Sequence, residues 1–466
     1  MAKQPMPDVV VVLPGILGSV LQKDGRDAWA INGGAILRGL LSLGASVQDL
    51  ALADDDPTVD DLGDGVTADR LMPDLHLIPG LWTIDGYGGI AQSIKKNFEV
   101  ESGQNYFEFP YDWRRDNRVA GRKLRRVSHV WLREWRERSG NADARLVLLA
   151  HSMGGLVSRA FLELEEGWRD TRMLVTFGTP YRGSLNALDF TANGFKKKVG
   201  PVTLLDLSNL LRSLTSVYQL LPIYPSYDPG DGQLLRLTEA TDIPNLDRAQ
   251  AAAARGFHDE ISDAVDAHQT DQSYLDGGYS VYPVVGTEQP TLQSGRLDGN
   301  RVKMLRDLGG QDLGGDGTVP RVSAQPLEWQ DPAQGMFSAE VHGSLQNSPA
   351  VLTQVKGLLT AAQIDLSQFR APAFKLSLDV DDLFGTEEPI EIGGRTNTRS
   401  ARLTVAVTDA DSGREVARAL LGTTGAEGWK AAEIPPQPEG VYRCVLSSDS
   451  SRDTVTGIFT VLKATE

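Results

Sequence analysis

The sequence has a single cysteine, no long apolar run and fewer basic than acidic side chains. With only Cys444 among 466 residues, no intramolecular disulfide can form. The net charge of −16 argues against a nucleic-acid partner and against nonspecific adsorption to anionic membranes. No stretch approaches the ~20 apolar residues of a transmembrane helix. The first residues also lack the apolar core and cleavage site of a signal peptide, so we expect a cytoplasmic protein.

What is present is ordinary globular composition in a long chain. Hydrophobic residues make up 41% and charged residues 23%, and 466 residues suffice for two or three domains with separate cores. Over residues 1–367, strand patterns alternate with helical ones, which predicts an α/β domain with a mostly parallel sheet. Over residues 368–466, alternating apolar and polar stretches separated by Gly-, Asp- and Pro-rich turns predict a small all-β sandwich domain.

The α/β region centres on residues 146–156, Leu-Val-Leu-Leu-Ala-His-Ser-Met-Gly-Gly-Leu. An apolar run of strand length meets Ser152, and a helical pattern follows at once. A serine at a sharp turn between strand and helix is the layout of a nucleophile elbow, which tolerates only very small residues two places to either side. Ala150 and Gly154 fill those places, the alanine being a mild departure from glycine. The alternative is a serine that only caps the helix beginning at Met153.

A second loop has the composition of an oxyanion hole. Residues 9–13 are five apolar residues, typical of a strand buried on both faces, and they lead into Pro-Gly-Ile-Leu-Gly-Ser at 14–19. In a hydrolase this loop supplies one backbone N–H donor, and the residue after the nucleophile supplies the other. We therefore predict the N–H groups of Ile16 and Met153 as donors, with Leu17 in reserve. An ordinary tight turn is the alternative.

A catalytic triad completes the prediction. A serine hydroxyl becomes a nucleophile when an imidazole takes its proton, and that imidazole needs a carboxylate to fix its tautomer. In α/β-hydrolases the chain order is serine, acid, histidine. Asp316 lies in a glycine-rich loop beyond Ser152, and His342 is the only histidine after it. Ser152, Asp316 and His342 are therefore the predicted triad, with Asp312 and Asp189 as alternative acids.

Neither a metal nor a cofactor is predicted. His258 and His268 precede Asp316 and would break the triad order; ten residues apart and without cysteine partners, they do not form a metal site and are expected at the surface. Asp379, Asp381 and Asp382 are a calcium candidate, for which a solvated loop is the favoured interpretation.

Three segments allow two interpretations each. Residues 33–53 are either an amphipathic helix packed on the core, which is favoured, or a cover that touches membrane. Residues 201–221 are predicted as one helix ended by Pro222, and its leucines suit either a lid over an apolar pocket or plain core packing. Residues 114–138 hold ten basic against three acidic residues; a solvated helix burying a Leu/Val/Trp stripe is favoured over a phosphate-binding patch.

Five motifs occur in the order seen in the lecithin:cholesterol acyltransferase family, which includes lysosomal phospholipase A2-like enzymes and bacterial acyl hydrolases. They lie at 14–19, 110–114 (Pro-Tyr-Asp-Trp-Arg), 150–155, 178–184 and 315–319, and the chain resembles that family over roughly residues 8–360. The resemblance implies an α/β-hydrolase fold with a helical lid, inserted at about 25–100 and 190–275. It also implies a hydrophobic-substrate pocket, for which the candidates are Leu17, Trp113, Leu207, Leu211 and Leu214.

The resemblance further implies a serine-dependent acyl-ester hydrolase or acyltransferase that acts on lipids through an acyl-enzyme on Ser152. Unlike secreted members, this chain lacks disulfide cysteines and adds the C-terminal β-domain. Expected partners are a lipid or other hydrophobic acyl ester, a transient membrane surface, and a protein or glycan bound by the β-domain. Two alternatives stay open: a non-lipid esterase or thioesterase, and a partner-binding scaffold with an idle hydrolase site.

Overall fold

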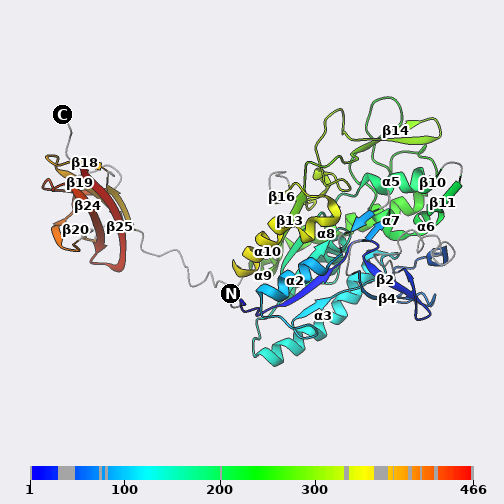
Figure 1. Ribbon diagram of the computed structural model, residues 1–466, viewed down its shortest axis with the longest axis horizontal. Coiled ribbons are helices and arrows are strands. Elements are labelled where there is room, and N and C mark those ends of the chain that lie inside the picture. The colour runs from blue at the N-terminus through cyan, green and yellow to red at the C-terminus, as the bar shows by residue number, and fades with distance from the viewer. Residues whose placement is uncertain are drawn as a thin grey trace. The chain divides into compact units, whose positions relative to one another are not determined.

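The computed structural model describes residues 3–29, 48–72, 76–78, 82–84, 86–199, 202–329, 335–361, 376–380, 383–396, 401–409, 412–423 and 429–462. The chain divides into two compact units, Met1–Gln363 and Ile364–Glu466, each of which is described by itself (Figure 1). The domain boundary expected between residues 367 and 368 falls outside the described residues.

A six-stranded, wholly parallel sheet forms the frame of the first unit. Its strands, in spatial order, are β16 (Met336–Ser338), β13 (Ser280–Gly286), β9 (Thr171–Phe177), β8 (Leu146–His151), β1 (Val9–Leu13) and β7 (Tyr106–Glu108). The two apolar runs noted in the sequence are neighbours, since β1 pairs with β8 from Val9 opposite Leu146 to Leu13 opposite Ala150. Both are buried along their whole length, as expected for strands covered on both faces.

Alternate side chains of these strands enter two separate apolar cores, one on each face of the sheet. Val9, Val11 and Leu13 belong to the larger core, whereas Val10 and Val12 belong to the smaller one. Helices α3 (Asn117–Ser139) and α4 (Gly154–Arg159) contribute to the larger core, and α2 (Gly88–Asn97) and α10 (Pro349–Ala361) to the smaller. Because successive strand side chains point to opposite faces, both faces of the sheet are covered, in agreement with the α/β domain that the alternation of strand and helical patterns predicts.

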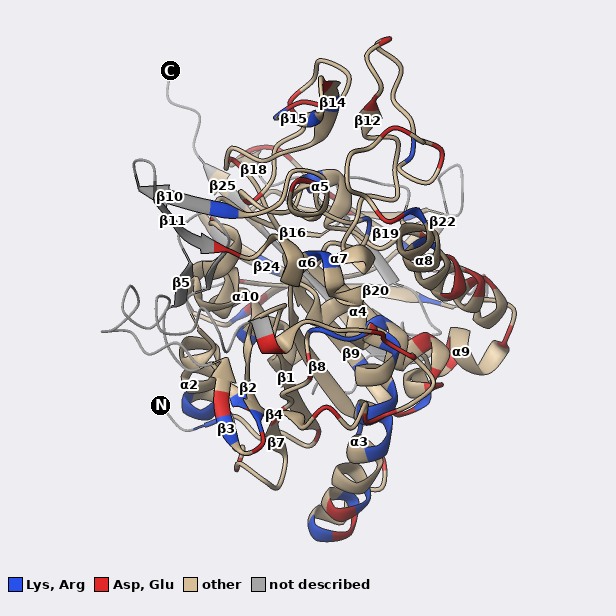
Figure 2. Ribbon diagram, turned by 90° about the vertical axis from the view of Figure 1, so that its right-hand side faces the viewer, with Lys and Arg blue, Asp and Glu red and all other residues tan. Residues whose placement is uncertain are grey.

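The basic segment is a helix, α3, with matched charges. It begins at an Asp116 cap, whose carboxylate accepts from the Arg118 N–H, and ends at Gly140, whose φ is 70°. Its stripe faces inward, with the Trp131 ring stacked 4.1 Å from that of Phe107. Five of the basic residues that colour α3 in Figure 2 pair with carboxylates: Arg118 with Asp116 and Glu260, Arg122 and Arg126 with Asp60, and Arg125 and Arg136 with Asp170. The solvated helix is therefore favoured over a phosphate patch.

The single helix predicted over residues 201–221 is wrong. The structure has strand β11 (Val202–Asp206), paired with β10 (Lys196–Val199), and then two short helices, α6 (Ser208–Ser213) and α7 (Thr215–Gln219). The Asp206 carboxylate accepts from the Ser208 N–H, which starts a new helix, and Leu214 then adopts extended backbone. Leu207, Leu211 and Leu214 are buried in the larger core, so core packing is the interpretation that holds for them.

The first unit contains further strands and helices outside the six-stranded sheet. Antiparallel strands β2 (Ser19–Lys23), β3 (Arg26–Trp29) and β4 (Val66–Leu71) follow the first loop, and β5 (His76–Ile78) pairs with β6 (Trp82–Ile84). Most of segment 33–53 lies outside the described residues; its described part includes the short helix η1 (Gln48–Leu50). No helix of the described residues is long and apolar enough to cross a membrane. The remaining elements are η2 (Ala160–Leu164), η3 (Gly167–Asp170), α5 (Leu185–Ala192), β12 (Tyr227–Asp228), α8 (Arg248–His268), α9 (Gln272–Gly277), β14 (Ser294–Asp298), β15 (Arg301–Leu305), η4 (Arg321–Ser323) and η5 (His342–Asn347).

The second unit consists of two small, mostly antiparallel sheets around one core, as the alternating pattern predicts. Ile390 and Ile392 of one sheet pack with Leu403 and Val405 of the other, and Cys444 is buried among them. Asp381 and Asp382 of the calcium candidate lie outside the described residues. One sheet holds β17 (Leu376–Val380), β19 (Ile390–Thr396), β23 (Lys430–Ile434) and β22 (Gly422–Thr423); the other holds β18 (Leu383–Gly385), β25 (Ser451–Leu462), β24 (Gly440–Ser448), β20 (Leu403–Asp409) and β21 (Glu415–Leu420).

Candidate active site

Ser152 stands at a sharp turn between the end of β8 and the start of α4. Its φ of 52° lies in the left-handed region, which costs a non-glycine residue of order 1 kcal/mol and persists only when its surroundings enforce it. They do so here: the Ser152 N–H donates to the carbonyl of Phe177 at 2.9 Å, and the Ser152 carbonyl accepts from the Thr179 hydroxyl at 2.9 Å. The end of β9 and the loop that follows it thus hold the serine in its strained conformation.

The loop at residues 14–19 lies directly against this turn. A Cβ added to Gly15 would stand 2.8 Å from Cβ of Ser152, and one added to Gly154 would stand 2.5 Å from the carbonyl oxygen of Pro14. No side chain fits at either place. The small residues that the sequence shows around Ser152 therefore allow two backbones to approach closely.

Three side chains far apart in the sequence form one hydrogen-bonded array. The Ser152 hydroxyl lies 3.0 Å from Nε2 of His342, and Nδ1 of His342 lies 2.8 Å from Oδ2 of Asp316. A carboxylate can only accept, so Nδ1 carries the proton and Nε2 is free to accept one from the serine. The other Asp316 oxygen, Oδ1, accepts from the N–H groups of Thr318 and Val319 at 2.9 and 2.7 Å. The exposed fraction is 6% for Ser152, 4% for His342 and 1% for Asp316, so the three residues are almost completely shielded from solvent.

Two glycines make room for the Asp316–His342 pair. A Cβ on Gly178, whose φ is 57°, would lie 2.7 Å from Oδ2 of Asp316 and 2.8 Å from Nδ1 of His342. A Cβ on Gly286, the last residue of β13, would collide with Cβ of Asp316. Gly178 opens the Gly-Thr-Pro motif, and this contact supplies a physical reason for the glycine there that the sequence alone does not show.

The alternative acids are placed elsewhere. Asp312 is exposed and accepts from the Gly314 N–H at 2.8 Å, and Asp189 accepts from the Asn193 amide at 2.6 Å. Among the three aspartates considered, the structure brings only Asp316 to the His342 ring.

The surface placement expected for His258 is wrong. The ring is buried on the inner stripe of α8, and its Nε2 donates to the carbonyl of Gln219 at 2.8 Å. Burial lowers the pKa of His258 to about 4. His268, the last residue of α8, is partly buried, and its Nδ1 lies 2.8 Å from a carboxylate oxygen of Glu163. Neither histidine joins the triad.

Among the described residues, no group of three or more His, Cys, Asp or Glu side chains is arranged to hold a metal.

The residues predicted as oxyanion donors are buried near Ser152. Ile16 and Met153 are buried beside the elbow, and Met153 is the residue before α4. Within the described residues we find no hydrogen-bond acceptor for the N–H groups of Ile16, Leu17 or Met153. Leu17 has a φ of 64°, an unusual conformation for a leucine, which marks this loop as a second strained segment beside Ser152.

Trp113, a pocket candidate, contacts the loop at 14–19. It is fully buried, its Nε1–H donates to the carbonyl of Ser19 at 3.0 Å, and its ring meets that of Trp29 edge-on at 5.3 Å. Leu17, a further candidate, is also buried. The next residue of the motif, Arg114, is buried between Asp112 and Asp64 at 2.7 and 2.9 Å. The Tyr-Asp-Trp-Arg element therefore ties the loop at 14–19 to the acidic loop at 54–65.

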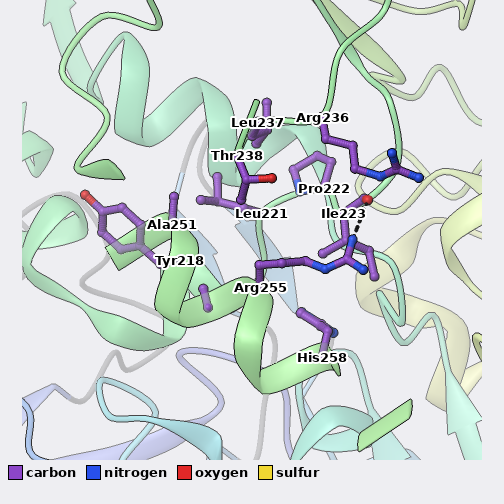
Figure 3. A pocket seen from close by; sticks show the side chains of 11 residues that line it. Tyr218, Leu221, Pro222, Ile223, Arg236, Leu237, Thr238, Ala251, Arg255 and His258 are labelled. Carbon is purple, nitrogen blue, oxygen red and sulfur yellow. Dashed lines mark hydrogen bonds between the residues drawn. The ribbon is translucent and has the colours of Figure 1, made fainter. Parts of the chain in front are cut away.

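A small cavity lies under α8, apart from the triad residues (Figure 3). Its volume of about 10 Å³ has room for about one water molecule and none for an acyl chain. The side chain of Arg255 crosses it and donates to the carbonyl of Ile223 at 3.1 Å. The cavity is lined by Tyr218, Leu221, Pro222, Ile223, Arg236, Leu237, Thr238, Ala251, Ala254, Arg255 and His258.

The parallel sheet, the strained serine after β8 and the acid and histidine on later loops define an α/β-hydrolase fold. Residues 84–282 match the sequence model of the lecithin:cholesterol acyltransferase family. The chain is therefore similar to that family over this segment, which contains three of the five motifs, those at 110–114, 150–155 and 178–184.

Two curated proteins that carry the same name are similar in sequence to part of this chain. Lysosomal phospholipase A and acyltransferase of Homo sapiens is 26% identical over 232 residues, which cover 49% of this chain and 54% of that protein. The protein of the same name from Canis lupus familiaris is 25% identical over 195 residues, covering 41% and 46%. The chain thus spans about half the length of the curated relatives it matches. Lipase BlEst2 of Bacillus licheniformis, in its mature form, aligns with a TM-score of 0.32 and 15% identity over 77% of this chain and 94% of that one, a likeness too weak to define a fold.

Proposed function

We propose that this protein is a serine-dependent acyl-ester hydrolase or acyltransferase that acts on lipids. The observation that carries the proposal is the buried array in which Ser152 contacts His342 and His342 contacts Asp316, beside backbone N–H groups that have no acceptor in the described part of the chain. The lipid class of substrate rests on the family match and on the names of the relatives, which combine phospholipase and acyltransferase activities.

In the first half-reaction, Oγ of Ser152 attacks the ester carbonyl carbon while Nε2 of His342 takes its proton. The negative charge that develops on the carbonyl oxygen is stabilised by the N–H groups of Ile16 and Met153, each worth about 3 kcal/mol in the transition state. Collapse of the tetrahedral intermediate breaks the bond to the leaving alcohol, which takes the proton from His342. Ser152 is then acylated.

In the second half-reaction, His342 takes a proton from water or from a second alcohol, whose oxygen attacks the acyl carbon. The new tetrahedral intermediate releases a fatty acid or a new ester, and the proton returns to Oγ of Ser152. Asp316 does not change protonation state; it holds the Nδ1–H tautomer and stabilises the imidazolium formed in each half. Exclusion of water from the site would favour the alcohol acceptor.

A fluorophosphonate probe tests the nucleophile. We expect covalent labelling of the folded wild-type protein and none of Ser152→Ala. Absence of labelling in folded wild type would overturn the proposal and favour a partner-binding scaffold with an idle site.

Lipid mass spectrometry tests the substrate class. Wild type and Ser152→Ala are incubated with long-chain phospholipid vesicles, with and without an added lipid alcohol, and in parallel with short-chain soluble esters and thioesters. Ser152-dependent loss of phospholipid, with release of fatty acid or of a new ester, is expected. Turnover of the soluble compounds alone would favour the non-lipid esterase or thioesterase.

A further inference from the structure

The peptide bond between Pro14 and Gly15 is held at both ends by tyrosine hydroxyls. Tyr111 donates its hydroxyl proton to the carbonyl of Pro14 at 2.8 Å, and the N–H of Gly15 donates to the hydroxyl oxygen of Tyr87 at 2.8 Å. This C=O and this N–H belong to one rigid, planar unit. The two hydrogen bonds therefore fix the rotation of that plane, from which the chain continues into Ile16.

The direction of each hydrogen bond follows from the partners. The carbonyl of His342, 3.1 Å from Nε2 of His151, can only accept, so Nε2 carries the ring proton and Nδ1 is an acceptor. Tyr87, whose hydroxyl lies 3.1 Å from that Nδ1, donates to it and keeps its oxygen free to accept from Gly15. Burial lowers the pKa of His151 to about 3, with the nearby His342 as a smaller cause, so the ring stays neutral as this pattern requires.

The network closes on the loop that carries the catalytic histidine. In η5, the side-chain amides of Gln346 and Asn347 donate to the carbonyl of Gly86 at 2.9 and 3.2 Å. The amide oxygen of Asn347 also accepts from the N–H of Ile90, in the first turn of α2. Tyr87, between these contacts, is thus positioned by the same loop as His342.

The glycines of the loop make space for the tyrosine hydroxyl. A Cβ on Gly18 would lie 2.7 Å from the Tyr87 hydroxyl and 2.8 Å from Cβ of Pro14. The end of the loop is fixed as well, because the hydroxyl of Ser19 accepts from the N–H of Tyr111 at 3.1 Å. The loop is therefore held by side chains along its length, and none of these contacts uses the N–H groups of Ile16 or Leu17.

We propose that Tyr87 and Tyr111 are positioning residues that clamp the Pro14–Gly15 peptide plane, so that the N–H groups after it face the developing oxyanion. His151 links this clamp to the backbone of His342. The inference rests on the proposed function for the role of the loop in catalysis. A clamp of this kind acts on the transition state, whereas a tyrosine that only fills space lowers stability and leaves kcat unchanged.

Hydroxyl deletions test the clamp. Tyr87→Phe and Tyr111→Phe each remove one hydrogen bond to the same peptide and keep the ring. Tyr224→Phe is the matched control, since its hydroxyl donates to the carbonyl of Gln293 at 3.2 Å, outside this network. With a soluble p-nitrophenyl ester, we expect kcat to fall about tenfold to a hundredfold in either clamp variant, with KM little changed. The affinity for a trifluoromethyl ketone, which forms an oxyanion adduct with the serine, should fall in parallel.

Two outcomes separate the clamp from the proposed function. Amide hydrogen exchange over residues 14–19 should be faster in both clamp variants than in wild type or Tyr224→Phe, whatever the activity. Unchanged exchange, or unchanged kcat and ketone affinity in active variants, would overturn the clamp. If the wild-type protein showed neither ester turnover nor fluorophosphonate labelling, both the proposed function and the catalytic role of the clamp would be contradicted. The amide exchange of residues 14–19 would still show whether the two tyrosines hold the peptide. If Tyr87→Phe does not fold, Tyr111→Phe tests the same peptide from its other end.

Discussion

The carbonyl oxygen of His342 accepts a hydrogen bond from Nε2 of His151, the residue immediately before Ser152. The backbone that carries the proposed base is therefore tied to the turn that carries the proposed nucleophile. This contact is separate from the one between the His342 ring and the Ser152 hydroxyl. The hydrogen bond from the Tyr87 hydroxyl to Nδ1 of the same ring requires His151 to be neutral, because a doubly protonated ring has no acceptor for that hydroxyl.

Two buried, neutral histidines make stability depend on pH. The pKa values of His151 and His258 are lowered from 6.5 to about 3 and about 4, so between those values and 6.5 the unfolded chain binds more protons than the folded one. The contribution of each histidine is complete above pH 6.5 and is lost as the pH falls below it, by up to about 1.4 kcal/mol per pH unit.

We therefore expect the free energy of unfolding in urea to decrease from pH 7 to pH 5. His258→Gln, which keeps a donor for the Gln219 carbonyl, should reduce that slope. Equal slopes in wild type and His258→Gln would show that His258 does not contribute to the pH dependence.

Gly178 is predicted to be essential for a steric reason. In Gly178→Ala the new methyl group would stand against the Asp316–His342 hydrogen bond, so the pair must separate. We expect kcat to fall at least about a hundredfold, since misplacement by about 1 Å has that effect. Gly140→Ala is the matched control: its φ of 70° gives the same backbone strain, but no atom outside its neighbours lies within 4 Å of the added Cβ. It should cost about 1 kcal/mol of stability and leave kcat unchanged. Equal kcat in the two variants would contradict the steric explanation.

Much of the frame and of the site could be predicted from the sequence because the relevant patterns are local. A strand buried on both faces has a continuous apolar run, as in β1 and β8, and the elbow needs small residues at fixed distances from Ser152. The chain order then selects His342 as the histidine and favours Asp316 over Asp312 and Asp189 as the acid, and the structure places Asp316 and His342 in contact.

What the sequence did not show depends on contacts between distant segments. The leucine spacing over 201–221 is the same for one helix as for two, and the break depends on the extended backbone at Leu214. The sequence shows no cysteine partner for His258 and so predicts a surface residue, but the ring is buried and its acceptor is the carbonyl of Gln219, at the end of another helix. The bond between Tyr87 and Gly15 joins positions 72 residues apart, and neither residue carries a local sign of it.

Arg114 is one of two buried arginines that hold the acidic loop at 54–65, the other being Arg115, and its loss is predicted to lower stability. The Arg114 side chain is 1% exposed and bridges Asp112 and Asp64. In Arg114→Leu those carboxylates lose their counter-charge, which typically costs about 3–5 kcal/mol. Arg70→Leu is the control, because Arg70 is 48% exposed and its pairs with Asp27 and Asp69 are worth about 1 kcal/mol or less. Urea unfolding measures both variants, and a similar loss in the two would mean that the loop does not depend on Arg114.

Asp316 is predicted to act through the tautomer of His342 and not through the fold. In Asp316→Asn the side-chain oxygen can still accept from the N–H groups of Thr318 and Val319, but the amide nitrogen faces Nδ1 and reverses the ring tautomer. Nε2 then carries a proton and cannot take one from Ser152, so we expect kcat to fall by about 10⁴. The melting temperature should change little. Asp312→Asn, at the exposed alternative acid, should keep wild-type kcat because Asp312 binds the Gly314 N–H and not the His342 ring. A large loss of kcat in Asp312→Asn with none in Asp316→Asn would show that Asp312, and not Asp316, is the acid of the triad.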